Sequence, residues 1–190
     1  MSDSHDPSLP ISEWLSSLRI RLAVKKDLRA MEWEGAYQRF RGVYADVFAR
    51  TRRGMALMWV VEQPGGRLLG QAFVQLNMSD HTCANGKERA YLHSFRVRPE
   101  FQGRGLGSAI MNHIEKDLIS RGFRELTLNV AEENEGALRL YRRLGYQILK
   151  KIPGKWSYFD DQGKLQTVIE PGYRLIKMLK EPSSQSSAVS

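Results

Sequence analysis

The sequence predicts an α/β protein, because strand-like and helix-like segments alternate along it. Apolar segments at 55–62 and 68–76 flank a Pro-Gly-Gly turn, which is typical of an antiparallel hairpin. A further strand at 90–97 runs through a glycine-rich turn into an amphipathic helix that ends near Gly122. A strand at 126–130, again followed by a helical pattern, repeats this order.

The segments on either side extend the same pattern. Residues 19–24 alternate as a first strand, and Asp27 can open a helical region that reaches about Arg53 and is divided at Gly35 and Gly42. Beyond the second helix we expect two more strands, at 147–151 and 173–179. The segment that joins them, 152–172, is expected to be an extended hairpin that is suited to be a flap.

The length of 190 residues fits one domain, which we place at 19–180 between a flexible N-terminal arm at 1–18 and a disordered tail at 181–190. Apolar residues at helical spacing allow one docked turn within the arm: Ile11, Trp14, Leu15 and Leu18. The chain has no apolar run of about 18 residues and no signal-peptide pattern at its N-terminus, so we expect a cytoplasmic protein without a membrane partner. A single cysteine, Cys83, agrees with a reducing compartment.

The chain is basic, with a formal net charge of +8. Its ends contribute only acidic residues, so the body at 19–180 carries +12. Such a surface favours a polyanionic ligand. Nucleic acid or the ribosome is the rival partner, disfavoured because the basic residues are spread along the chain without an RNA-binding motif.

The glycine-rich turn is suited to bind phosphate. Gly103, Gly105 and Gly107 let the backbone approach a ligand, and the first N–H groups of the next helix point toward it. Gln102 and Arg104 can add side-chain donors. The turn lacks the Gly-Lys-Ser/Thr of a Walker loop, and its glycine spacing does not fit a dinucleotide-binding fingerprint.

Two motifs resemble those of the GCN5-related N-acetyltransferases (GNAT). The run 102–107 is similar to the family's Gln/Arg-x-x-Gly-x-Gly/Ala signature, and the strand at 126–130, Asn134, Tyr141 and Gly145-Tyr146 match its second half. The resemblance runs from about Ile20 to Leu179. It implies a mixed, mostly antiparallel sheet of six or seven strands, splayed between strands four and five and flanked by about four helices.

The resemblance also implies a binding site for acetyl-coenzyme A as cosubstrate. The backbone N–H groups of Phe95 and Val97 would meet the thioester carbonyl, and Asn134 would contact the pantetheine arm, although it can also be a plain helix cap. Tyr141 would be the general acid to the coenzyme A thiolate, the structural alternative being a packed aromatic. The pyrophosphate would lie on Gln102, Gly103, Arg104, Gly105, Leu106, Gly107 and Ser108.

The general base is not assigned by the resemblance. Several members of the family carry a glutamate on strand four or five, but the matching positions here are Tyr91 and Asn129, and neither is a competent base. The alternatives are His93, a glutamate just before the second helix (Glu132 or Glu133), or ordered water.

The expected function is transfer of an acetyl group from acetyl-coenzyme A to a primary amine, directly within a ternary complex. Cys83 lies outside the motifs and is a poor candidate for an acetyl-enzyme. We expect no metal, because His81, Cys83 and His93 are too few for a structural site. The alternative is a non-catalytic acyl-coenzyme A sensor or scaffold. The expected oligomeric state is a monomer or a homodimer.

The acceptor is not readable from the sequence: a protein N-terminus, a lysine, a polyamine, an amino acid or an aminoglycoside is possible. The basic charge disfavours strongly cationic acceptors unless acidic residues gather at the mouth of the site, namely Glu32, Glu34, Asp160 and Asp161.

Overall fold

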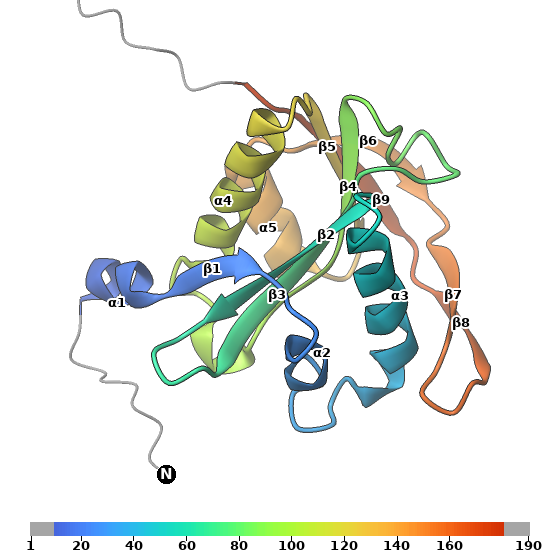
Figure 1. Cartoon of the computed structure of the whole chain (residues 1–190). Helices are drawn as coiled ribbons and strands as arrows, with labels where there is room; N and C mark the ends of the chain where they lie inside the picture. The colour runs from blue at the N-terminus through green and yellow to red at the C-terminus, as the bar shows by residue number, and fades with distance from the viewer. Residues whose placement is uncertain (1–9, 181–190) are drawn as a thin grey trace, which may run out of the picture.

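The computed structural model describes residues 10–180, and its framework is a seven-stranded sheet (Figure 1). Neighbouring strands are antiparallel except β4 and β5, which are parallel. The mixed, mostly antiparallel sheet that the sequence predicts is therefore confirmed. In spatial order its strands are β1 (Arg19–Leu22), β2 (Ala56–Glu62), β3 (Leu68–Gln75), β4 (Arg89–Val97), β5 (Glu125–Ala131), β9 (Gly172–Met178) and β6 (Gln147–Ile152).

Helices cover both faces of the sheet, because its central strands are apolar on both sides. On β2, Leu57 and Trp59 belong to the larger apolar core, together with buried residues of α4 (Leu106–Ser120) and α5 (Glu135–Arg143). Ala56 and Met58 alternate with them and belong to a second core with α3 (Arg41–Thr51). Because successive strand residues point to opposite faces, α4 and α5 lie on one face and α3 on the other (Figure 1).

The α3 face also carries a separate two-stranded hairpin, which lies within the segment at 152–172 as predicted. Its strands are β7 (Lys155–Phe159) and β8 (Leu165–Ile169). Two rings of β7 pack against Phe40, with centroid distances of 6.4 Å for Trp156 and 4.8 Å for Tyr158. These contacts attach the hairpin to the body of the domain.

Part of the N-terminal arm is docked on the domain. Helix α1 (Ile11–Ser17) buries Trp14, whose ring stacks on Phe101 at a centroid distance of 5.8 Å. Phe101 lies in the short helix η2 (Pro99–Phe101), directly before the glycine-rich turn. The docked turn that the apolar spacing allows is therefore present, while residues 1–9 and the predicted tail at 181–190 lie outside the described residues.

The helical region predicted from Asp27 to about Arg53 is divided around Gly35, as expected, but not at Gly42. It forms α2 (Asp27–Ala30), η1 (Gln38–Phe40) and α3, and Gly42 lies inside α3, so the division expected at Gly42 is wrong. The break at Gly35 forms because Trp33, Glu34 and Gly35 have left-handed φ angles of 46°, 57° and 97°. Arg98 holds this turn by donating two hydrogen bonds of 2.8 and 2.9 Å to the Glu34 carboxylate.

Strands β4 and β5 separate part-way along their length. Their pairing runs from Arg89 opposite Glu125 to Leu92 opposite Leu128, and no further pair is formed. At the same point the register of β4 against β3 shifts, and Ser94 has a φ of 50°. An irregularity of this kind bends a strand away from its neighbour. The predicted splay between the fourth and fifth strands is thus confirmed.

Candidate active site

A cleft of about 840 Å³ opens where β4 and β5 separate. Its walls come from β4, the glycine-rich turn, the end of β5 and α5, with further residues from the α3 side of the sheet. Ten of the residues singled out in the sequence line it: His93, Phe95, Val97, Gln102, Gly103, Gly105, Gly107, Ser108, Asn134 and Tyr141.

One end of the cleft is the N-terminus of α4. Gly105 is the residue before the helix, with a left-handed φ of 83°, and no side chain of residues 10–180 caps the helix there. The first N–H groups of α4, at 106–108, therefore remain available as hydrogen-bond donors. Gly107 brings α4 close to α5, because a Cβ atom at this position would lie only 3.2 Å from Leu140 Cδ2. These features fit an anionic group at the helix end.

Two side chains expected to bind phosphate are engaged with the protein instead. The Gln102 amide donates a 2.9 Å hydrogen bond to the Val97 carbonyl, which fixes the start of the turn. The Arg104 guanidinium lies 4.3 Å from the centre of the Trp14 ring, so it contacts α1. Leu106 is buried in the larger core and faces away from the cleft. In this structure the donors that the turn leaves available are therefore mainly backbone N–H groups.

The free edge of β4 forms a second wall of the cleft. The Arg98 N–H donates to the Leu69 carbonyl of β3, and successive N–H groups of a strand point to opposite edges. The N–H groups of Val97 and Phe95 therefore face away from β3, toward the space that β5 leaves open. They are placed to donate to a carbonyl oxygen bound in the cleft.

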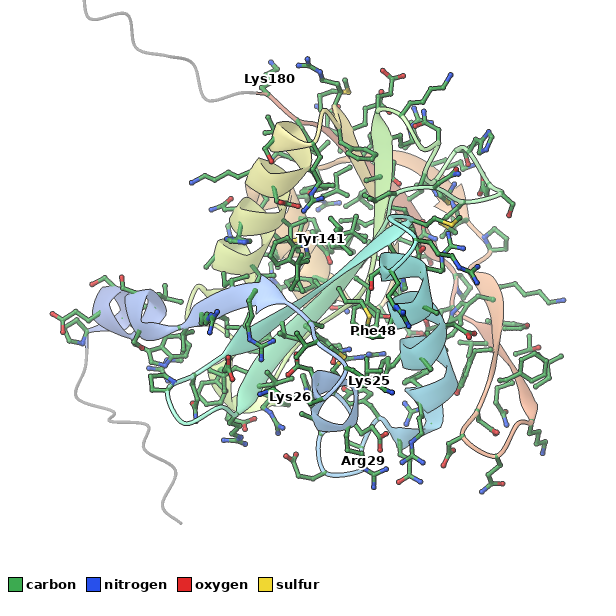
Figure 2. All side chains as sticks on the ribbon, in the orientation of Figure 1. Lys25, Lys26, Arg29, Phe48, Tyr141 and Lys180 are labelled. Atoms are coloured by element: carbon green, nitrogen blue, oxygen red, sulfur yellow. The ribbon has the colours of Figure 1, made fainter. Side chains whose placement is uncertain are left out.

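Helix α5 presents Asn134 and Tyr141 to the cleft. The Asn134 side chain caps the helix by accepting a 3.0 Å hydrogen bond from the Ala137 N–H. Tyr141, two turns later, packs its ring against Phe95 and Tyr146, with centroid distances of 6.4 and 5.6 Å. Figure 2 shows Tyr141 in the interior, on the side of the sheet that α4 covers. Burial raises the pKa of Tyr141 well above 10, so its phenol is protonated at neutral pH.

A family model described as the acetyltransferase (GNAT) family matches residues 23–146. The chain belongs to the GNAT acetyltransferase family.

Solved structures share the fold at low sequence identity. The ribosomal-protein-S18-alanine N-acetyltransferase from Escherichia coli is 20% identical, with 88% of this chain and 97% of that chain covered and a TM-score of 0.65. The spermidine N-acetyltransferase from Vibrio cholerae, in complex with CoA and spermine, is 17% identical, with 86% of this chain and 96% of that chain covered and a TM-score of 0.64. An N-acetyltransferase from Staphylococcus aureus is 18% identical, with 86% of this chain and 99% of that chain covered and a TM-score of 0.66.

His93 lines the cleft of this GNAT domain, but its ring nitrogens are already hydrogen-bonded. Arg50 donates a 2.8 Å hydrogen bond to Gln75 Oε1, so the Gln75 amide nitrogen, 3.0 Å from His93 Nε2, is the donor in that contact. The proton of the neutral ring is then on Nδ1, 3.1 Å from Ser94 Oγ. Burial is the main cause that lowers the pKa of His93 to about 4, and the positive charges of Arg96 and Arg50 lower it further. These contacts favour a positioning role for His93 over proton removal.

Neither of the two glutamates before α5 lines the cleft. Glu132 forms a 2.5 Å ion pair with Lys151, and Glu133 is exposed. The acidic residue that does line the cleft is Glu170, between β8 and β9. Sequence reasoning missed Glu170 because it lies in a loop outside the GNAT motifs. It also missed Tyr37 and Arg96, which line the cleft from the α3 side.

The single cysteine is outside the cleft. Cys83 is buried and its thiol donates a 3.2 Å hydrogen bond to Asp80 Oδ2. Burial and this hydrogen bond raise the pKa of the thiol to about 11, which disfavours a nucleophilic thiolate. In residues 10–180 no group of three or more His, Cys, Asp and Glu side chains is arranged to hold a metal ion, and His81, Cys83 and His93 are not brought together. Over the same residues, no helix has the length and apolar character needed to cross a membrane.

Proposed function

We propose that this protein transfers an acetyl group from acetyl-coenzyme A to a primary amine, by direct transfer in a ternary complex. The observation that carries the proposal is the cleft itself. It joins an uncapped helix N-terminus, the free edge of β4 and a buried tyrosine in one cavity. A long ligand with a pyrophosphate at one end and a thioester at the other fits this arrangement.

Binding of acetyl-coenzyme A would use mostly backbone donors. The N–H groups at 106–108, with Gly103 and Gly105 beside them, would hold the pyrophosphate at the positive end of α4. Arg139 and Arg143 of α5 line the cleft and add positive charge. Asn134 would meet the pantetheine arm with the polar atoms that its helix cap leaves available.

The chemistry needs stabilisation of an oxyanion and a proton for the leaving thiolate. The Val97 and Phe95 N–H groups would stabilise the oxyanion that forms when the amine attacks the thioester carbonyl. Tyr141 would then donate its phenolic proton to the coenzyme A sulfur, since burial keeps that proton in place at neutral pH.

Removal of a proton from the incoming ammonium group would fall to Glu170, directly or through water. Glu170 is the acidic residue of the described cleft lining, and its backbone N–H donates a 3.0 Å hydrogen bond to the Gly154 carbonyl. Its side chain would attract an ammonium group and accept its proton. His93 would position Ser94 at the irregularity of β4. The raised pKa of the Cys83 thiol and its place outside the cleft support direct transfer over an acetyl-enzyme.

The test is release of coenzyme A from acetyl-coenzyme A by the purified protein. Acceptors are supplied in pools: peptide N-termini, lysine peptides, polyamines, amino acids and aminoglycosides. Release that depends on one pool, with an acetylated amine as product, supports the proposal. Tight binding of acetyl-coenzyme A without release in any pool would instead favour the sensor or scaffold function. The variant Glu170→Gln is expected to lower turnover with little change in acetyl-coenzyme A binding.

A further inference from the structure

Arg96 places a positive charge in the cleft, on the face of the sheet that α3 covers. Its guanidinium lies 4.4 Å from the centre of the Tyr37 ring and 5.0 Å from that of Phe40. One of its nitrogens donates a 3.3 Å hydrogen bond to the hydroxyl of Tyr44. Three aromatic side chains thus hold the guanidinium in place, and its other N–H groups are left for a ligand.

No carboxylate of residues 10–180 forms an ion pair with Arg96. A partly buried guanidinium usually has a counter-charge, because removing it from water is costly. The charge of Arg96 is also felt within the cleft, where it contributes to the lowered pKa of His93. The site is therefore arranged to receive an anion.

The acidic residues that could have made the mouth of the cleft attractive to a polycation are used elsewhere. Glu32 accepts hydrogen bonds of 2.7 and 2.8 Å from Arg41, and Glu34 is paired with Arg98. Asp160 accepts from backbone N–H groups in the turn of the β7–β8 hairpin, and Asp161 accepts from Gln38. None of these four carboxylates lines the cleft. The described residues therefore offer no acidic groove for a polyamine.

We infer that Arg96 binds an anionic group of the acceptor, a carboxylate or a phosphate close to the amine that is acetylated. This inference rests on the proposed function, and it names the class of acceptor. The guanidinium offers a planar fork that matches two oxygens of such a group. Glu170, on the same cleft, provides the opposite charge for the ammonium end of the acceptor. An amine with an acidic group nearby, such as a free amino acid, carries both charges.

The experiment compares matched acceptors, one member of each pair with the anionic group and one without it. One pair is pooled free amino acids and their carboxamides, and the other is phosphoethanolamine and ethanolamine. The quantity compared within each pair is the kcat/KM for coenzyme A release. We expect the wild-type protein to favour the anionic member of one pair by about 10- to 100-fold, the range for hydrogen bonds to a charged group. The pair that shows the preference identifies the anion as carboxylate or phosphate. Arg96→Met should reduce the preference to near unity, and Arg96→Lys should keep part of it.

Arg39→Met is the matched control. Arg39 also lies over the Phe40 ring, at 4.7 Å, but it does not line the cleft. Its loss removes a cation from the same aromatic cluster and should leave the preference unchanged. Equal kcat/KM for the two members of each pair, a preference that survives in Arg96→Met, or turnover confined to polyamines would overturn the inference while leaving the acetyltransferase proposal intact.

Direct binding separates the inference from the proposed function when no acceptor is turned over. Each member of the two pairs is then titrated calorimetrically into the protein saturated with coenzyme A. Binding of an anionic member that is lost in Arg96→Met and kept in Arg39→Met supports the inference without any catalysis. Failure of both anionic members to bind overturns it.

Discussion

Replacing Tyr141 with phenylalanine should slow the chemical step and leave the fold unchanged. The ring is 5% exposed and packs against Phe95 and Tyr146, and phenylalanine keeps those contacts. The hydroxyl has no hydrogen-bond partner among residues 10–180, so its removal should change the free energy of unfolding by less than about 0.5 kcal/mol. Loss of a general acid typically lowers a rate by at least about 10²-fold, which corresponds to about 2.7 kcal/mol in the barrier.

The neighbouring tyrosine provides a control with the opposite expectation. The Tyr146 hydroxyl donates a 2.8 Å hydrogen bond to Glu115 Oε1 and does not line the cleft. Tyr146→Phe leaves a buried carboxylate oxygen without this donor and should lower the free energy of unfolding by about 1–3 kcal/mol. Its kcat should stay within about twofold of wild type, a barrier change of less than about 0.5 kcal/mol.

Steady-state coenzyme A release and urea unfolding of both variants test this pair of expectations. Calorimetric titration with acetyl-coenzyme A completes the measurement, and Tyr141→Phe should bind as the wild type does. If Tyr141→Phe lost stability and coenzyme affinity while its kcat was unchanged, the role of Tyr141 would be packing and the general-acid assignment would be refuted.

Three further changes test other parts of the site. Asn134→Ala should lower the free energy of unfolding by about 1 kcal/mol through loss of the helix cap, whereas Asn134→Asp keeps the cap. Weaker acetyl-coenzyme A binding in both variants, measured by calorimetry, would indicate a contact between Asn134 and the pantetheine arm. Because the folded-state pKa of His93 is lowered from 6.5 to about 4, the unfolded chain binds the proton first, so stability should be full above pH 6.5 and fall by up to about 1.4 kcal/mol per pH unit between pH 6.5 and 4. Urea unfolding at several pH values should show a flatter dependence in His93→Gln, and an unchanged slope would contradict the buried neutral ring. Trp14→Ala should lower the free energy of unfolding by about 3 kcal/mol and also weaken acetyl-coenzyme A binding, since Trp14 supports Arg104 in the glycine-rich turn. Trp14→Phe should lose less stability and less affinity. Full coenzyme affinity in Trp14→Ala would show that α1 does not support binding at the turn.

The parts of the site that the sequence predicts are those encoded by local pattern. Gly103, Gly105 and Gly107 stand between a strand and a helix, so their place at a helix N-terminus follows from residues close together in the chain. Asn134 and Tyr141 are two helical turns apart, and this spacing places both on one face of α5.

The parts that the sequence does not predict depend on contacts between distant segments. Arg96 is held by Tyr37, Phe40 and Tyr44, which are brought to it only when α3 packs on the sheet. Glu170 reaches the cleft because β9 inserts between β5 and β6.

The orientation of individual side chains is equally hidden from the sequence. Arg104 is attractive as a phosphate ligand, yet its guanidinium lies over Trp14, about ninety residues earlier in the chain. A sequence pattern gives the residue type and its place on an element, while the competition among possible partners is decided by tertiary packing.

The most direct test of acetyl-coenzyme A binding in this cleft is calorimetric titration into the wild-type protein and two glycine variants. Gly105→Glu places a carboxylate at the end of α4, where the pyrophosphate is expected, and should abolish measurable binding. Gly163→Glu is the control, because Gly163 has a similar φ of 76° in the exposed β7–β8 turn and does not line the cleft. Wild-type affinity in Gly163→Glu with loss in Gly105→Glu is the predicted result. Equal affinity in all three proteins would contradict the assignment of the cleft.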